Sequence, residues 1–386
     1  MPPVEKYLTR WHLAQTGFDN NKVTIRRILS HTAGLSREGY PGVVPTEEIP
    51  PVEEILTGKN KDKPDVRVII EPGTRFKYSG GGFTLLQLVI EEITGEKYTD
   101  FIKKEILIPL GINQNTDFNL TPKIEHLAAT GYNSKGEPND CYYFIEPDAC
   151  GSLSTNVVDF SKIVQTYITN TEILNNSNRI VTAKTLELMY TPIAKIEGII
   201  GADSVGLSFF METLDNGVKI ISHGGSNKGY KSNFWLDPKS GDGLVVFTNS
   251  SNGEAFYSNI LYKWSKWEFG AIPAHIKALN KKFLIIASLG VFLNLLFLIL
   301  VFGFIWQCIQ RRRKFVYISK QKSVSKKVIR ATLSIILPAC AIVVWMTRMH
   351  ANLDSFDPIR GYWVSIGVVL CCIVLILNGL FYKTKK

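Results

Sequence analysis

The chain has 386 residues with 44 Lys and Arg, 34 Asp and Glu, and a formal net charge of +10. Residues 281–386 hold 16 of the basic side chains but only two acids, which leaves residues 1–280 with 28 basic and 32 acidic side chains, a net charge of −4. The positive charge therefore gives no reason to expect nucleic-acid binding by the first 280 residues. A chain of this length allows two domains, or one domain with an appendage.

The first 280 residues alternate between helical and strand-like patterns. Helical spacing of apolar residues predicts helices over residues 24–29, 83–94, 98–106, 157–169, 182–190 and 254–269. Alternating patterns separated by turn residues predict strands over 205–213, 218–223, 231–236 and 243–249. Helices followed by an antiparallel meander and a closing helix indicate an α+β protein.

The C-terminal part contains three apolar runs, at about residues 283–307, 328–347 and 361–382. Each approaches or exceeds the ~20 residues that a membrane-spanning helix needs. A buried helix of a soluble core is the alternative for each run, and it weighs most for the second, which Pro338 interrupts. We expect a domain over 1–270, a linker over 271–282 and a membrane region over 283–386.

Basic residues between the first two runs predict the topology. No acid occurs in the loop 308–330, whose basic residues are Arg311, Arg312, Arg313, Lys314, Lys320, Lys322, Lys326, Lys327 and Arg330. The positive-inside rule predicts a cytoplasmic loop and C-terminus, hence a domain outside the plasma membrane, and the basic loop is expected to contact anionic lipid of the bilayer. An exported domain needs a signal peptide or an earlier span, yet the first 30 residues contain no apolar segment.

The cysteines and the other metal-binding residue types predict no cofactor. Cys141 and Cys150 lie in the domain expected outside the cell, where a disulfide is chemically permitted, and the sequence leaves open whether they are bridged. Their spacing fits no metal signature, and no metal-binding constellation occurs elsewhere in the chain. We therefore expect neither a metal nor an organic cofactor.

Two short glycine-rich motifs are the strongest chemical signals. They are Tyr78-Ser79-Gly80-Gly81-Gly82 and His223-Gly224-Gly225-Ser226. Taken singly, the first is a helix N-terminus and the second a strand bend where backbones approach closely. Taken together, they suggest a site that attacks a carbonyl. His31, taken alone, is better explained as a hydrogen-bonded structural residue than as a catalytic one.

Residues 1–270 resemble the penicillin-binding-protein-like serine hydrolases, the group that contains class C β-lactamases, D,D-peptidases and related esterases. The matching segments, in the family's order and spacing, are Val4–Leu8, Val23–Leu35, Glu71–Ser79, Ile108–Gly111, Gly151–Thr155 and His223–Ser226. The resemblance implies a β-lactamase/transpeptidase-like fold, with an antiparallel sheet flanked by helices and a helical subdomain. It also implies hydrolysis of a β-lactam, a D-amino peptide or an ester through an acyl-enzyme.

The resemblance assigns roles to six residues. Tyr78 matches the tyrosine of a Tyr-x-Asn element and would act as general base or proton shuttle. His223 matches the Lys or His of a Lys/His-x-Gly element, near the tyrosine and the substrate carboxylate or leaving group. Gly224 and Gly225 would let substrate lie against the strand, and the Ser226 amide would donate to the oxyanion. Gly80 stands at the substrate-binding place where the family has asparagine.

The nucleophile of the family, a Ser-x-x-Lys motif, is absent from residues 1–270. The only such strings are Ser319–Lys322 and Ser323–Lys326, in the loop expected inside the cell. We expect a missing N-terminal segment that carries a signal and the nucleophile, an inactive chain as written, and an open edge at the strand 243–249. The alternative is a non-catalytic pseudoenzyme that binds peptides or cell-wall fragments at the cell surface.

Overall fold

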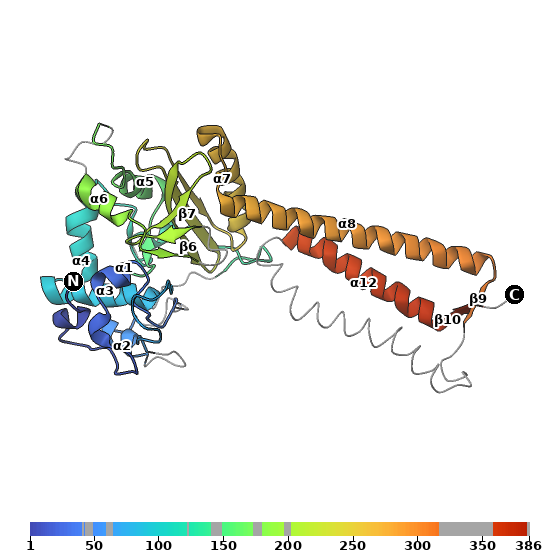
Figure 1. Ribbon diagram of the computed structural model, residues 1–386, viewed down its shortest axis with the longest axis horizontal. Coiled ribbons are helices and arrows are strands. Elements are labelled where there is room, and N and C mark those ends of the chain that lie inside the picture. The colour runs from blue at the N-terminus through green and yellow to red at the C-terminus, as the bar shows by residue number, and fades with distance from the viewer. Residues whose placement is uncertain are drawn as a thin grey trace. The chain divides into compact units, whose positions relative to one another are not determined.

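The computed structural model describes residues 1–40, 42, 49–58, 65–121, 123–139, 149–172, 180–196, 202–315 and 358–383. They divide into two compact units, Met1–Ile276 and Lys277–Lys386, whose elements are labelled in Figure 1. The division falls inside the predicted linker, residues 271–282, where helix α8 (Ala274–Ile309) begins. Two sequence predictions, the apolar run 328–347 and a bridge involving Cys141, lie outside the described residues.

The first unit is built on a six-stranded antiparallel sheet of order β3-β4-β5-β6-β7-β8. Its strands are β3 (Ala194–Lys195), β4 (Ser204–Val205), β5 (Phe210–Thr213), β6 (Lys219–Asn227), β7 (Tyr230–Leu236) and β8 (Gly243–Thr248). The sheet with its surrounding helices confirms the predicted α+β fold. β8 has one neighbour among the described strands, so the predicted open edge is confirmed there.

The strand expected over 205–213 is instead two strands joined by a turn. The turn closes through a hydrogen bond from the Gly206 amide to the Phe209 carbonyl at 2.9 Å, and Ser208 has a left-handed φ of 70°. A side chain at Gly206 would lie 2.1 Å from the carbonyl oxygen of Met189. Contact with a helix that is distant in sequence therefore fixes this turn, and the alternation of the residues did not predict it.

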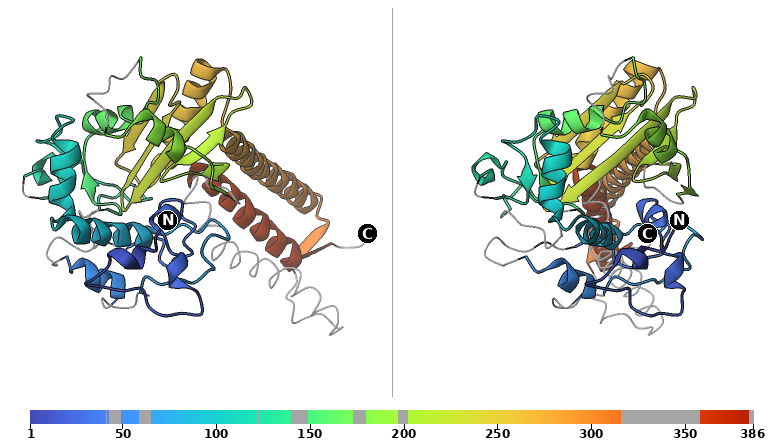
Figure 2. Two further views of the ribbon diagram at one scale, coloured as in Figure 1. Left: turned by 60° about the vertical axis from the view of Figure 1, so that its left-hand side comes forward. Right: turned by 90° about the vertical axis from the view of Figure 1, so that its left-hand side faces the viewer.

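Helices cover both faces of the sheet. Figures 1 and 2 show α7 (Gly253–Phe269) on one side and α5 (Val157–Gln165) with α6 (Ala183–Met189) on the other. Successive β6 residues alternate between the two cores: Ile220 packs in the α7 cluster and Ile221 in the α5 cluster. His223, opposite Phe234 in register, belongs to the same face as Ile221.

The remaining elements of the first unit are mostly helical and precede the sheet. They are η1 (Val4–Tyr7), η2 (Asn20–Lys22), α1 (Ile25–Leu29), α2 (Val52–Thr57), α3 (Gly80–Thr94), α4 (Tyr98–Ile102), the π-helical turn η3 (Lys103–Leu107), β1 (Asp117–Phe118), η4 (Glu125–Leu127) and β2 (Leu153–Ser154). β1 pairs with β2. Leu85 and Leu88 of α3 are fully buried against α1, α2 and the adjoining loops, which anchors the start of α3.

Gly34 closes the turn that follows α1, and its replacement tests how firmly that turn is fixed. Its φ is +67°, and a Cβ there would lie 2.0 Å from the carbonyl oxygen of Ile70. We expect Gly34→Ala to lower the free energy of unfolding by about 3 kcal/mol, because left-handed strain adds to a backbone clash.

Urea unfolding of the full chain in detergent micelles, followed by near-ultraviolet circular dichroism, measures this change. Gly17→Ala is the matched control, since nothing lies within 4 Å of a Cβ at that position. Equal midpoints for the two variants would contradict the prediction.

In the described part of the second unit there are two helices and a short β-pair. α8 contains Leu284–Ile309, the one segment among the described residues that is long and apolar enough to cross a membrane. α12 (Pro358–Leu380) covers the third predicted run, but its apolar part, Trp363–Val374, is shorter. The Asn294 side chain of α8 donates to the Trp363 carbonyl at 3.0 Å, and β9 (Arg313–Phe315) pairs with β10 (Phe381–Lys383).

Candidate active site

Tyr78 lies at the N-terminal end of α3, directly before the residue that caps the helix. The Ser79 hydroxyl accepts the Gly82 amide at 3.1 Å and donates to the Ser36 carbonyl at 2.7 Å. This cap starts α3 at Gly80, one turn earlier than the apolar spacing predicted. Ser79 is buried and Tyr78 is half-buried, so the tyrosine ring stands at the edge of the packed region.

His31 lies beneath this segment. It follows α1 with a left-handed φ of 52° and is only 3% exposed. Its Nδ1 accepts the Ser79 amide at 3.1 Å, and its ring centroid is 4.3 Å from that of Tyr78. Phe76 and Phe83 pack against the same imidazole, with centroids at 5.8 and 5.3 Å. His31 is therefore buried and hydrogen-bonded, as predicted.

His223 approaches the tyrosine from β6. The two ring centroids are 6.5 Å apart, although 145 residues separate the positions in the chain. Phe210 stacks on the imidazole at 5.0 Å and 17°. Nδ1 lies 2.9 Å from the carbonyl oxygen of Gly224, and since a carbonyl only accepts, we assign the proton of neutral His223 to Nδ1. Nε2 is thereby left as an acceptor.

The strand beside His223 has backbone groups that no described strand covers. The pairing of β5 with β6 stops at Phe210, the first residue of β5, which lies opposite Ser222, while β6 continues to Asn227. The Leu214 amide donates to the Val218 carbonyl at 2.8 Å, so the backbone groups of Val218 point toward β5. In an antiparallel ladder every second residue points the same way, so the amides of Gly224 and Ser226 also point to the β5 side of β6. Gly224, Gly225 and Ser226 are exposed. An extended substrate backbone could therefore pair with this edge.

Gly80 occupies a different environment from the one expected of a substrate contact. It is buried, its amide donates to the Glu38 carbonyl at 3.1 Å, and a Cβ there would lie 2.6 Å from the Cys150 sulfur. The amide of Gly80 is therefore already used within the fold. The absence of a side chain at this position makes room for Cys150.

Both histidines of the site are neutral near pH 7. Burial, with a smaller contribution from His223, lowers the pKa of His31 to about 3. Burial also lowers the pKa of His223, partly opposed by the hydrogen bond to the Gly224 carbonyl. Each imidazole therefore offers one nitrogen as an acceptor and carries no charge. Among the described residues, no group of three or more His, Cys, Asp or Glu side chains could hold a metal ion.

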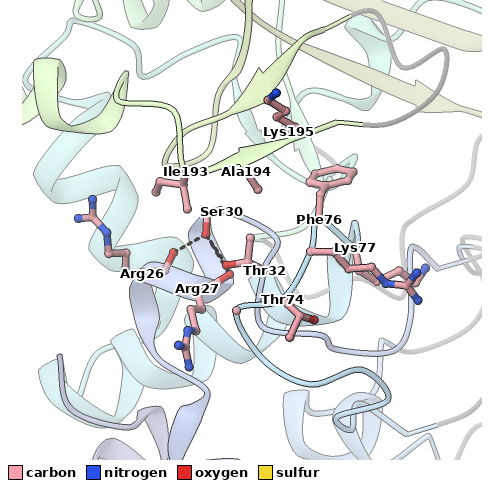
Figure 3. A pocket seen from close by; sticks show the side chains of 12 residues that line it. Arg26, Arg27, Ser30, Thr32, Thr74, Phe76, Lys77, Ile193, Ala194 and Lys195 are labelled. Carbon is pink, nitrogen blue, oxygen red and sulfur yellow. Dashed lines mark hydrogen bonds between the residues drawn. The ribbon is translucent and has the colours of Figure 1, made fainter.

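A separate cavity of about 780 Å³ lies next to Phe76. Its basic lining residues are Arg26, Arg27, Arg75, Lys77 and Lys195. Figure 3 shows the Arg26, Arg27 and Lys195 side chains pointing away from the centre of the cavity, and Lys77 pairs with Glu38. The cations therefore do not converge on one point. Tyr78, His31 and His223 do not line this cavity, so it is not part of the candidate active site.

The sequence did not predict that aromatic side chains surround the two histidines. Phe210 stacks on His223, while Phe76 contacts both His31 and Phe210, at 5.8 and 6.3 Å. Aromatic residues at these positions carry no motif, and each reads as an ordinary core residue. The contact of Phe76 with Phe210 of β5, more than 130 residues away in the chain, is seen only in the folded structure.

An antiparallel sheet with helices on both faces, with Tyr78 near His223 of β6, fits the class of β-lactamase-like proteins. The chain belongs to the β-lactamase family: the family model described as "Beta-lactamase" matches residues 2–263. It is 26% identical over 197 residues to a putative penicillin-binding protein PbpX of Bacillus subtilis, covering 49% of this chain and 43% of that one. It is 23% identical over 254 residues to a human putative beta-lactamase-like 1 protein, covering 63% and 47%.

Solved structures show the same fold. The octameric penicillin-binding protein homologue from Pyrococcus abyssi matches with a TM-score of 0.55 and 28% identity, over 70% of this chain and 60% of that one. A β-lactamase/D-alanine carboxypeptidase from Yersinia pestis, complexed with citrate, matches with a TM-score of 0.50 and 19% identity, over 64% and 70%. The chain spans about half the length of the curated relatives named above.

Proposed function

We propose that the chain is a membrane-anchored β-lactamase-like serine hydrolase whose residues 1–276 carry the tyrosine, histidine and oxyanion edge of an acyl-transfer site. One observation carries the proposal. The rings of Tyr78 and His223 lie 6.5 Å apart, beside a stretch of β6 that extends past the end of β5. The substrate classes are those of the sequence analysis: a β-lactam, a D-amino peptide or an ester.

In the proposed reaction a serine hydroxyl attacks the substrate carbonyl. The Oγ–C bond forms, the carbonyl C–N or C–O bond breaks, and the hydroxyl proton passes through Tyr78 to the leaving group. His223 Nε2 accepts a hydrogen bond from the tyrosine hydroxyl or from the substrate. The Ser226 amide donates to the oxyanion, an interaction that is typically worth about 3 kcal/mol. Water then hydrolyses the acyl-enzyme. Gly80 shapes the site by leaving space and donates no hydrogen bond to substrate.

The serine in this proposal does not come from the folded unit that holds Tyr78. Residues 1–276 contain no Ser-x-x-Lys string, and the two strings in the chain start at Ser319 and Ser323. Positive charge in the 308–330 loop favours a cytoplasmic location for both, on the other side of the bilayer from the proposed site. We therefore expect the 386-residue chain by itself to be inactive.

Labelling with a fluorescent penicillin or a fluorophosphonate tests this proposal. The chain alone should show no labelled serine in residues 1–276, because no serine there is paired with the lysine of the motif. A longer form that places a Ser-x-x-Lys helix before residue 1 should be labelled at that serine. If the chain alone is labelled within residues 1–276, the account of the nucleophile is wrong. If the longer form is folded and stays unlabelled, the proposed chemistry is wrong.

The absence of a Ser-x-x-Lys string from residues 1–276 also favours a second candidate, a pseudoenzyme that binds peptides or cell-wall fragments without reacting. The exposed β6 edge supports this candidate equally, since main-chain pairing needs no nucleophile. Calorimetric titration with a D-Ala-D-Ala peptide separates the two functions. Binding of the peptide by every folded form, with no labelling of any of them, would favour the pseudoenzyme.

The membrane part of the proposal rests on α8. Leu284–Ile309 is apolar over 26 residues, about 39 Å of helix at 1.5 Å per residue, and so exceeds the thickness of a hydrocarbon core. We propose a multi-pass plasma-membrane protein with its hydrolase domain outside and its C-terminus inside, following the basic residues that flank the apolar runs. Protease accessibility of the intact cell surface tests the orientation.

A further inference from the structure

One buried residue binds the backbone on both sides of the candidate catalytic tyrosine. The carbonyl oxygen of His31 accepts the Lys77 amide at 2.7 Å. Nδ1 of the same residue accepts the Ser79 amide at 3.1 Å. Tyr78 lies between these two amides, and its ring packs over the imidazole with centroids 4.3 Å apart. Three contacts from a single residue therefore fix the segment from which the phenol projects.

The conformation of His31 makes this double contact possible. The His31 amide donates to the Ile28 carbonyl at 3.0 Å, so the residue is held just after the last turn of α1 with its φ at 52°. A left-handed residue after the last helical turn ends the helix, and here the carbonyl and the ring of His31 bind the same segment. Histidine and asparagine adopt this conformation more readily than most residues. The strain is therefore placed where the tyrosine is held.

The Ser79 contact requires one particular form of the imidazole. A backbone amide only donates, so Nδ1 must be unprotonated and the ring proton must be on Nε2. The ring is 3% exposed and packs against Phe76 and Phe83, which excludes water from it. Among the described residues, Tyr78 packs against the ring and His223 lies close enough to affect its pKa, and neither is an anion that could stabilise an imidazolium.

We propose that His31 is the positioning residue of the site, which as a neutral Nε2–H imidazole holds the Lys77 and Ser79 amides and thereby sets the Tyr78 phenol opposite His223. The inference rests on the proposed function only in taking Tyr78 as the proton-transfer group. The two histidines then have separate tasks. His31 acts through Tyr78 and does not touch substrate, whereas His223 lies beside the exposed residues Gly224–Ser226 of β6.

Nuclear magnetic resonance of ring-¹⁵N-histidine in the full chain, in detergent micelles, tests the required tautomer. The His31 signals, identified by their loss in His31→Asn, should show an Nε2–H tautomer that stays neutral from pH 8 to pH 5. They should also show a through-hydrogen-bond coupling from Nδ1 to the Ser79 nitrogen. A proton on Nδ1, or an imidazolium at pH 5, overturns the inference. This arm needs no activity, so it decides the point even if the proposed chemistry fails.

Three variants then separate positioning from general packing. His31→Phe keeps a ring but removes the acceptor, and amide exchange at Ser79 should become at least tenfold faster. His31→Asn tolerates the same φ and offers an amide oxygen, so it should restore most of that protection. Phe83→Leu disturbs packing on the same imidazole while leaving Nδ1 in place, and should keep the protection within threefold. Equal loss in His31→Phe and Phe83→Leu would assign His31 a packing role alone.

The effect on the tyrosine is read from its own signal. With ¹³Cζ-tyrosine labelling, the Tyr78 resonance, identified by its loss in Tyr78→Phe, should shift in His31→Phe and return toward the wild-type position in His31→Asn. In any form of the chain that the serine probe labels, the labelling rate should follow the same order, with at least a tenfold loss in His31→Phe. An unmoved Tyr78 resonance in His31→Phe would overturn the inference.

Discussion

Replacing Tyr78 with phenylalanine should lower the rate of acylation at least 100-fold in any form of the chain that a serine-directed probe labels. A positioned proton-transfer group typically contributes 10²–10⁴-fold to a rate, and this substitution removes only the hydroxyl. The ring would remain over His31, at a centroid separation of 4.3 Å, so the fold of the segment is retained. The measurement is the second-order rate constant for labelling by fluorescent penicillin or fluorophosphonate.

Tyr98→Phe is the matched control, because Tyr98 packs against Phe118, in a different core cluster from the one below Tyr78. It should keep the wild-type labelling rate within about twofold. A Tyr78→Phe variant that also stays within about threefold of the wild type would remove the phenol from the proposed mechanism. Circular dichroism of both variants checks that the fold is unchanged.

The stability of the first unit should decrease as the pH falls from 6.5 toward 4.5. Unfolded His31 has its ordinary pKa of 6.5, whereas burial lowers the pKa of folded His31 to about 3. Between these values the unfolded chain binds the extra proton, so acid favours unfolding. The stabilisation is complete above pH 6.5 and decreases by about 1.4 kcal/mol for each pH unit below it. At pH 5 the loss from His31 is therefore about 2 kcal/mol.

Other groups affect neighbouring parts of the pH range. The lowered pKa of His223 adds to the loss in the same direction. Asp117 and Asp159 also have lowered pKa values, but their contribution decreases only as the pH falls through about 4. The pKa of Glu92 is also lowered from its ordinary value of 4.5, so urea unfolding between pH 5 and 7 follows the histidines.

His31→Asn should remove about one proton from the pH dependence of the unfolding free energy. His126→Asn, at an exposed turn, controls for the loss of a histidine as such. If wild type and His31→Asn show the same slope between pH 5 and 7, then His31 is not buried as a neutral base. That result would also weaken the positioning role, which depends on an unprotonated Nδ1.

Local signals in the sequence predicted the framework of the site. The predicted helix 83–94, preceded by the Tyr78–Gly82 motif, and the predicted strand 218–223, which ends at His223, gave the two elements that carry the site. The antiparallel meander followed from turn residues spaced between alternating segments, since hairpin pairing connects neighbours in the chain. The family resemblance added the expectation that Tyr78 and His223 belong to one site. The 6.5 Å separation of their rings agrees with that expectation.

Contacts between segments far apart in the chain could not be predicted from the sequence. The split of the expected strand 205–213 depends on Gly206 packing against the Met189 carbonyl. The loss of Gly80 as a possible hydrogen-bond donor depends on the Glu38 carbonyl, 42 residues away. In each case the deciding partner is a backbone carbonyl, a group that every residue carries and that no pattern of side chains identifies.

The sequence by itself determined which elements form, because caps, turn glycines and apolar periodicity act within a few residues. It also determined that a tyrosine and a histidine lie at the ends of two of these elements. Only the tertiary structure decided that His31 binds the amides on both sides of Tyr78, and that Phe210 stacks on His223. The physical reason is that burial, protonation and hydrogen-bond pairing depend on which groups from distant parts of the chain come into contact. Those contacts form only when the chain folds.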